Sequence, residues 1–155
     1  RFAQLDWTPI RYINRAVHRR ALTALYRSSR IGLVTPMRDG MNLVAKEYVA
    51  AQDPADPGVL VLSQFAGAAR QMQAALLVNP FDAVAVSEAI QTARHMPLEE
   101  RQHRHRQLME GLLTEDVAHW RESFLDDLDA TYQAATPAQP PITPAREHRS
   151  WTQAA

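Results

Sequence analysis

The run Val59-Leu60-Val61-Leu62 places four apolar side chains in succession, two of them β-branched. A strand that is apolar on both faces is typical of the centre of a parallel sheet, because helices cover both sides of such a sheet. The turn-rich residues 53–58 lead into this run, and we expect a short helix at about 66–72 after it. The pattern therefore predicts a buried central strand with further elements on either side.

Short apolar runs alternate with helical patterns on both sides of this strand. We expect further strands at 10–13, 31–34 and 75–78, and helices at 17–26, 41–51 and 81–94. Strand–helix units with short connections indicate a parallel α/β sheet with right-handed crossovers. With about four strands, this sheet is half of a doubly wound, Rossmann-like domain.

The pattern changes after the last of these helices. Two helices are expected at 98–113 and 115–132 with no strand between them. Residues 135–155 contain four of the ten prolines and little periodicity, which is typical of a disordered tail. We therefore divide the chain into a partial Rossmann-like domain at 1–95, carboxy-terminal helices of the same domain at 96–134, and the tail.

The composition excludes several kinds of site and partner. Seventeen basic and seventeen acidic side chains cancel, so no broad electrostatic field attracts nucleic acid or an anionic membrane. The absence of cysteine excludes disulfides and cysteine-ligated metal centres, and no apolar run approaches the roughly 20 residues of a membrane span. We expect a cytoplasmic protein without a secretory leader. Because the chain begins at Arg1 rather than Met, we interpret it as part of a longer polypeptide.

The strongest candidate for a ligand site is the Asp-Gly connection between the strand at 31–34 and the helix that follows it. Ligands of doubly wound sheets bind beyond the carboxyl ends of the strands. Asp39 is a candidate helix cap, Gly40 lets a ligand approach the backbone, and the free N–H groups of 41–44 suit a phosphate. Glu47, one turn farther, suits two adjacent hydroxyls such as those of a ribose. Many such turns are plain connections, so this pattern alone leaves the site undecided.

The order of residues at this connection carries a resemblance to a known family. The stretch Arg38-Asp39-Gly40-Met41-Asn42-Leu43-Val44-Ala45-Lys46-Glu47-Tyr48-Val49-Ala50 is similar, almost residue for residue, to the donor-site signature of the trehalose-6-phosphate synthases, glycosyltransferase family 20. The similarity continues at 57–69, at 78–82 and, upstream, at 5–9. This similarity covers roughly residues 5–130 and is strongest with the bacterial single-function synthases.

The resemblance implies a GT-B architecture, in which two Rossmann-like domains face each other across the active site. This chain would hold part of the carboxy-terminal, donor-binding domain, with its last helices packing back toward the amino-terminal domain. The family transfers glucose from UDP-glucose to glucose 6-phosphate with retention of configuration, which yields trehalose 6-phosphate and UDP without a metal or other cofactor. Relatives are often tetramers, so the resemblance also implies a homo-oligomer.

The resemblance also implies roles for individual residues. Asp39 would bind hydroxyls of the transferred glucose as the catalytic carboxylate, while Glu47 would hold the ribose. The backbone at 40–42 would contact the glucose and the pyrophosphate, and the N–H groups of Leu43 and Val44 would hold phosphate oxygens. The donor-binding set implied in this way is Val17, whose backbone would face the uracil, together with Asp39, Gly40, Met41, Asn42, Leu43, Val44, Ala45, Lys46 and Glu47.

The resemblance also limits what this chain can do alone. In the family, the acceptor-binding residues and the basic pair that clamps the diphosphate lie upstream of the matching segment. We therefore expect the 155 residues by themselves to be inactive. No covalent nucleophile is visible at the motif, and the family is expected to use a front-face mechanism in which the departing phosphate removes the acceptor proton.

Several side chains have simpler interpretations beside these. Lys46 points away from the apolar stripe of its helix and suits a solvated or packing role, and Arg38 could contact phosphate or anchor the loop. His103 and His105 are two residues apart, which places them on different sides of a helix and argues against a shared metal ion. The alternative for the whole chain is a non-catalytic module of the same fold that binds a nucleotide sugar or a partner subunit.

Overall fold

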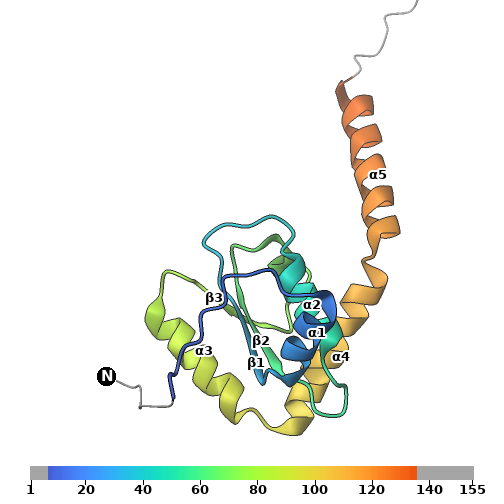
Figure 1. Cartoon of the computed structure of the whole chain (residues 1–155). Helices are drawn as coiled ribbons and strands as arrows, with labels where there is room; N and C mark the ends of the chain where they lie inside the picture. The colour runs from blue at the N-terminus through green and yellow to red at the C-terminus, as the bar shows by residue number, and fades with distance from the viewer. Residues whose placement is uncertain (1–6, 136–155) are drawn as a thin grey trace, which may run out of the picture. The chain divides into compact units, whose positions relative to one another are not determined.

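The computed structural model describes residues 7–135, and its centre is a parallel sheet of three strands (Figure 1). The strands are β1 (Ile31–Val34), β2 (Val59–Ser63) and β3 (Leu76–Val78), in the order β1-β2-β3. Val61 pairs with Leu33 on one side and with Leu76 on the other. All five residues of β2 are buried, which confirms the central strand predicted from its unbroken apolar run.

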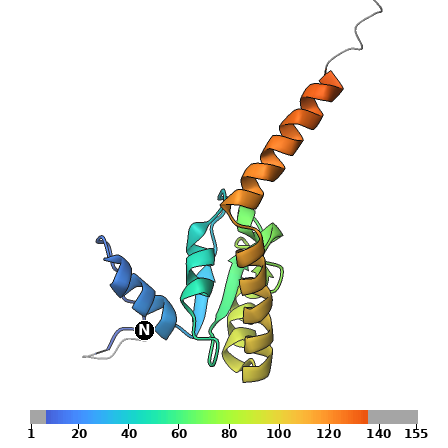
Figure 2. The same cartoon turned by 90° about the vertical axis from the view of Figure 1, so that its right-hand side faces the viewer.

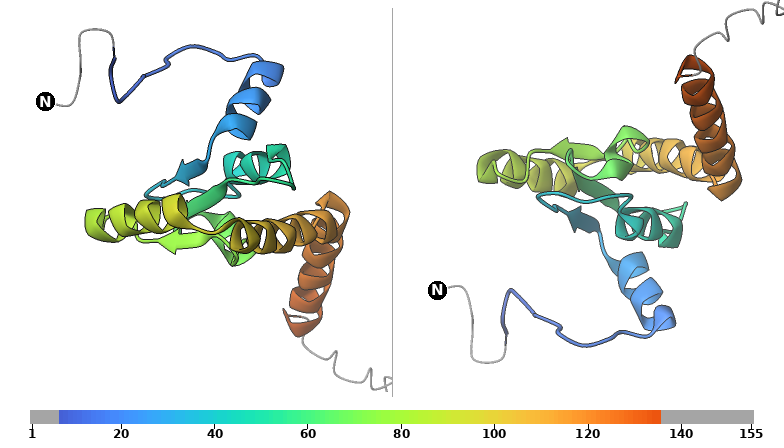
Figure 3. Two further views of the ribbon diagram at one scale, coloured as in Figure 1. Left: turned by 90° about the horizontal axis from the view of Figure 1, so that it is seen from below. Right: turned by 90° about the horizontal axis from the view of Figure 1, so that it is seen from above.

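Helices alternate with the strands along the chain, which confirms the predicted α/β class. They are α1 (Arg19–Ser28), α2 (Leu43–Ala51), the 3-10 helix η1 (Gly67–Arg70), α3 (Ala83–His95), α4 (Leu98–Thr114) and α5 (Val117–Ala135). Helices α2 and α3 lie on opposite sides of the sheet (Figure 3). Helix α1 packs beside α2 and away from the strands (Figure 2).

The side chains of β2 alternate between two apolar clusters, one on each face of the sheet. Leu60 and Leu62 pack with residues of α2 and α4. Val59 and Val61 pack on the other face with residues of α3. Helices therefore cover both faces of this strand, which is the physical reason that its first four side chains are all apolar.

The strand predicted at 10–13 is not formed, and this prediction was wrong. Ile10 and Tyr12 are 81% and 85% exposed, and no strand pairs with this segment among the described residues. A β-branched and aromatic segment becomes a strand only where a neighbouring strand supplies hydrogen bonds and an apolar surface. The described part of the chain therefore has three strands rather than about four.

Helix boundaries differ from the predicted ones where a capping side chain decides them. Helix α1 begins at 19 rather than 17, because the His18 side chain accepts a hydrogen bond from the Arg20 N–H at 3.4 Å. Helix α3 begins at 83 rather than 81, because the Asp82 carboxylate accepts from the first free N–H groups of that helix. The helix expected at 66–72 is only the short η1. In each case the element exists; a side-chain cap sets the start of α1 and of α3, whereas η1 has no side-chain cap.

Helix α5 is the described part of a second unit, Asp116–Ala155. The rings of Trp120 and Phe124 stack with centroids 5.6 Å apart, and with Leu125 and Leu128 they form an exposed apolar stripe. The tail predicted at 135–155 lies outside the described residues from 136 onward. Between residues 7 and 135, no helix combines the length and the apolar character needed to cross a membrane.

Candidate functional site

The loop after β1 is tied by its backbone to the loop after β2, beyond the carboxyl ends of both strands. Asp39 forms an isolated parallel bridge with Ala66, and its N–H donates to the Phe65 carbonyl oxygen at 3.3 Å. The Gly67 N–H donates to the Gly40 carbonyl oxygen at 2.6 Å. These contacts hold Asp39 and Gly40 at the edge of the sheet where ligands of such folds bind.

The cap of α2 is Asn42, which removes the alternative role of Asp39 as the helix cap. The Asn42 side-chain oxygen accepts from the Ala45 N–H at 2.9 Å, so α2 begins at Leu43 rather than two residues earlier. The Asp39 carboxylate instead accepts from the Gly40 N–H at 2.8 Å and from the Asn42 side-chain amide at 2.6 Å. The physical reason is the left-handed backbone of Asn42, with φ 57°, which separates Asp39 from the helical turn. An asparagine just before a helical pattern was the signal that could have identified the cap.

The first turn of α2 presents two unpaired backbone N–H groups. Those of Leu43 and Val44 have no acceptor among the described residues, and the two residues are 59% and 46% exposed. The Ala45 N–H, by contrast, is taken by the cap. Free N–H groups at a helix start, together with the helix dipole, favour an anion such as a phosphate. The two N–H groups that the family resemblance assigns to phosphate are therefore unpaired and lie at an exposed helix start.

A pocket of about 450 Å³ between α1 and α2 brings together the two residues predicted to face the nucleoside. Its lining consists of Val17, Arg19, Leu22, Thr23, Tyr26, Glu47, Ala50 and Ala51. Val17 and Glu47 are far apart in the sequence, and the packing of α1 beside α2 makes them neighbours. Burial raises the pKa of Tyr26, and the negative charge of Glu47, which lines the same pocket, raises it further.

Lys46, the single lysine of the chain, is held by another side chain. Its ammonium group donates to the Gln71 side-chain oxygen at 2.8 Å and so ties α2 to the segment after η1. This contact favours the packing role over ligand binding. Arg38 is exposed and forms no ion pair with the described residues, so both of its predicted roles stay open.

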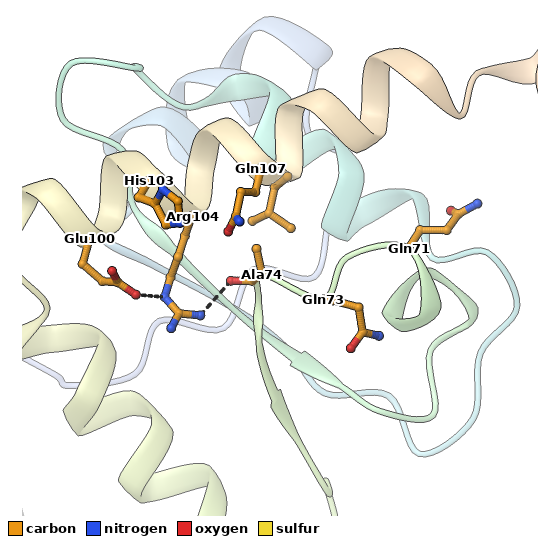
Figure 4. Close-up of a pocket in the computed structure, with 8 residues that line it drawn as sticks. Gln71, Gln73, Ala74, Glu100, His103, Arg104 and Gln107 are labelled. Atoms are coloured by element: carbon orange, nitrogen blue, oxygen red, sulfur yellow. Dashed lines mark hydrogen bonds and ion pairs between the residues drawn. The ribbon is translucent and has the colours of Figure 1, made fainter.

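A second pocket, of about 480 Å³, lies between α4 and the residues before β3 (Figure 4). Arg104 is part of its wall, with Nε 2.7 Å from the Glu100 carboxylate and Nη1 3.0 Å from the Ala74 carbonyl oxygen. Two of the five N–H donors of this arginine are thus used within the protein. His103 lines the pocket, whereas His105 is buried with Nε2 3.2 Å from a backbone carbonyl, so the two histidines face different surroundings.

The sequence reasoning missed the burial of Arg101. This side chain is 4% exposed, donates to the Pro57 carbonyl oxygen and lies 2.6 Å from the Asp56 carboxylate. It therefore holds the loop before β2 against α4. Arg101 belongs to a run of arginines and histidines that has the composition of a solvated helix face, so no local signal marks it as buried.

Comparisons with known proteins give the family of this chain. The family model described as Glycosyltransferase family 20 matches residues 1–130. The chain belongs to glycosyltransferase family 20. This family 20 chain is 61% identical over 127 residues to a trehalose-6-phosphate synthase of Sinorhizobium fredii, with 82% of this chain and 27% of that protein covered.

Solved structures of similar proteins share the fold of this family 20 chain. A UDP-forming alpha,alpha-trehalose-phosphate synthase from Burkholderia xenovorans, in complex with glucose-6-phosphate, is 57% identical with a TM-score of 0.77, covering 83% of this chain and 28% of that one. An Escherichia coli protein bound with UDP-2-fluoro glucose is 55% identical with a TM-score of 0.75, covering 81% and 28%.

The family 20 chain thus spans little more than a quarter of the length of the relatives that it matches. The likeness confirms the predicted Rossmann-like fold as part of a GT-B domain. It also confirms the homology to UDP-forming trehalose-6-phosphate synthases.

Proposed function

We propose that this chain supplies the donor side of a retaining glucosyl transfer from UDP-glucose to glucose 6-phosphate, which forms trehalose 6-phosphate and UDP. The observation that carries the proposal is the pair of unpaired N–H groups of Leu43 and Val44, about one helical turn from Glu47. These groups suit a diphosphate, and Glu47 beside Val17 suits the ribose and base of the same nucleotide. The two solved relatives, one with UDP-2-fluoro glucose and one with glucose-6-phosphate, support this donor and this acceptor.

Asp39 is the proposed ligand of the transferred glucose. Each of its carboxylate oxygens already accepts one hydrogen bond, one from the Gly40 N–H and one from the Asn42 amide. A carboxylate has about four acceptor positions, so about two are left for sugar hydroxyls. The side chain is exposed at the edge of the sheet, where hydroxyl groups can reach it.

In the proposed reaction, the bond between glucose C1 and the β-phosphate oxygen breaks, and its electron pair stays on the phosphate. The sugar passes through an oxocarbenium-like state, and the acceptor hydroxyl attacks from the face that the phosphate leaves. The hydroxyl proton passes to the departing phosphate oxygen. The N–H groups of Leu43 and Val44 would stabilise the charge that grows on the phosphate, because loss of one such donor costs about 3–4 kcal/mol in comparable oxyanion sites.

A coupled assay of UDP release tests the proposal on the complete polypeptide that carries these 155 residues. With UDP-glucose and glucose 6-phosphate both present, we expect UDP release to match the trehalose 6-phosphate formed. The 155-residue chain alone should show no turnover. Donor binding without any transfer by the complete polypeptide would favour the non-catalytic module. Turnover by the chain alone, near the rate of the complete polypeptide, would refute the donor-side assignment.

Replacing Glu47 by Ala tests the nucleotide-binding part of the proposal. The variant loses two hydrogen bonds between a charged carboxylate and the ribose, so we expect the Kd for UDP-glucose to rise roughly tenfold to a hundredfold. The Kd for glucose 6-phosphate should stay close to its wild-type value. Glu88→Ala, which removes an exposed carboxylate from α3, is the matched control. A loss of acceptor affinity in place of donor affinity would show that the role of Glu47 is wrongly assigned.

A further inference from the structure

Asn42 uses both ends of its side-chain amide in the candidate site. Its oxygen accepts from the Ala45 N–H at 2.9 Å, and its nitrogen donates to the Asp39 carboxylate at 2.6 Å. It is also the single residue other than glycine with a positive φ between residues 7 and 135. Asn42 therefore connects the start of α2, which has the unpaired N–H groups, to the carboxylate proposed to bind glucose.

Few residue types can meet the conditions at this position. The left-handed backbone region is adopted readily by glycine and, among other residues, mainly by asparagine and aspartate. Glycine supplies neither of the two hydrogen bonds. Aspartate can accept from the Ala45 N–H, but it has no proton to donate to Asp39 and would place a second negative charge beside it. An amide in the left-handed region is thus the group that meets all of these conditions.

The Asp39 side chain depends on this amide for its orientation. Its two oxygens are each held by one donor, the Gly40 N–H at 2.8 Å and the Asn42 amide at 2.6 Å. No arginine or lysine pairs with Asp39 among the described residues, and the side chain is exposed. Without the Asn42 donor, only the Gly40 N–H would restrain the carboxylate, and its free acceptor positions would no longer point in one direction.

We infer that Asn42 is a positioning residue that acts through Asp39 on the sugar part of the donor, separately from the phosphate-binding start of α2. The inference rests on the proposed glucosyl transfer. Asn42 has two separate tasks, because its oxygen supports the helix start while its nitrogen orients Asp39. UDP, which lacks the glucose, depends on the first task alone. Transfer from UDP-glucose depends on both tasks.

Two variants of the complete polypeptide separate these tasks. Asn42→Gly loses both hydrogen bonds but keeps the left-handed backbone and adds no charge. Because glycine is nearly as good a helix cap as asparagine, the Kd for UDP should change by less than about threefold. The loss of the donor to Asp39 should lower kcat/KM for UDP-glucose by about tenfold or more. Asn42→Asp keeps the acceptor for the helix start but repels Asp39. We expect its loss in kcat/KM to exceed its loss in UDP affinity by at least about tenfold.

Asn79 provides the matched control. Its side-chain oxygen accepts from the Phe81 N–H at 3.0 Å, in the turn between β3 and α3. Asn79→Gly and Asn79→Asp make the same chemical changes without touching Asp39, so kcat/KM should stay near the wild-type value. A role confined to capping predicts that any loss in transfer by Asn42→Asp equals its loss in UDP affinity, because the cap acceptor is kept and the added charge repels the diphosphate in both measurements. This readout therefore distinguishes positioning from a structural role.

The results of these measurements separate a failure of the inference from a failure of the proposed function. Transfer by both Asn42 variants at near wild-type rates, or losses in transfer no larger than the losses in UDP affinity, would overturn the inference and leave the proposed function intact. A wild-type polypeptide that neither binds UDP nor transfers glucose would refute the proposed function, and the inference with it. The wild-type measurement therefore tells the two failures apart.

Discussion

Replacing Gly67 by Ala should disturb the candidate site more than the rest of the fold. A Cβ atom at this position would overlap the Gly40 carbonyl oxygen and lie 3.0 Å from the carbonyl carbon of the same residue. Both atoms belong to the backbone, so no rotation of a side chain can relieve the overlap. Gly67 has no positive φ, and the glycine is therefore required for space and not for its backbone conformation.

The expected loss of stability in Gly67→Ala follows from the contacts that must change. Separating the two loops at Gly67 breaks one of their two backbone hydrogen bonds, that from the Gly67 N–H to the Gly40 carbonyl oxygen (2.6 Å), which contributes about 1 kcal/mol. Holding the loops together would cost about 1–3 kcal/mol through overpacking. We therefore expect the loops to separate, with a loss of about 1 kcal/mol in the free energy of unfolding. The donor affinity should fall as well, because the turn at Asp39 is no longer held in place.

Urea unfolding of the 155-residue chain measures the stability, and calorimetric titration of the complete polypeptide with UDP-glucose measures the affinity. Gly111→Ala is a matched control inside α4, where the new Cβ would meet only the Gln71 carbonyl oxygen, at 3.8 Å, and should stabilise the chain by about 0.5–1 kcal/mol. Gly40→Ala places a methyl group in the same loop with nothing within 4 Å. Wild-type stability and wild-type donor affinity in Gly67→Ala would refute the idea that this close approach holds the site.

Two further substitutions address the core. Leu62→Ala removes a fully buried side chain of β2, so the free energy of unfolding should fall by about 2–5 kcal/mol in a urea titration, and a change near zero would contradict the packing of the sheet. Burial raises the pKa of Tyr48 to about 12, so the folded chain holds this proton more tightly than the unfolded chain. This difference stabilises the folded chain at neutral pH, and the stabilisation is lost as the pH rises from about 10 to about 12. In Tyr48→Phe, the free energy of unfolding at neutral pH should be about 1 kcal/mol lower, because the hydrogen bond to the Ser29 carbonyl oxygen (3.0 Å) is lost. The decrease in the free energy of unfolding at alkaline pH should be about 2 kcal/mol smaller in this variant than in the wild type. An equal alkaline decline in both proteins, measured by urea unfolding at several pH values, would show that Tyr48 is not its source.

The elements that were predicted correctly are those with a local signal. The run at 59–62 is apolar on both faces, and a strand covered by helices on both sides buries such a run. The helix expected at 98–113 differs from α4 by one residue at its end. The segment at 10–13 has strand-like composition too, but a strand also needs a partner. The residues of a single segment carry no information about that partner, which is why this prediction failed.

Within the candidate site, the connection after β1 could be selected from the sequence, but the residue that caps α2 could not. Asp39 and Asn42 both belong to the residue types that cap helices. The left-handed backbone at Asn42 decides between them, in a loop whose backbone is tied to Ala66 and Gly67. These partners lie far along the chain, so no pattern around the Asp-Gly connection contains them. The packing of α1 beside α2, which joins Val17 to Glu47, is non-local in the same way.

The Asn42 cap meets two opposing requirements at the start of α2, helix stability and phosphate binding. A helix start is stabilised when its N–H groups are paired, but a phosphate site needs them unpaired. Asn42 pairs only the Ala45 N–H, which lies deepest in the turn, and leaves those of Leu43 and Val44 unpaired. An aspartate here would cap the helix comparably. It would also repel both a bound diphosphate and Asp39, so a neutral amide is the cap that is compatible with an anionic donor and with the carboxylate beside it.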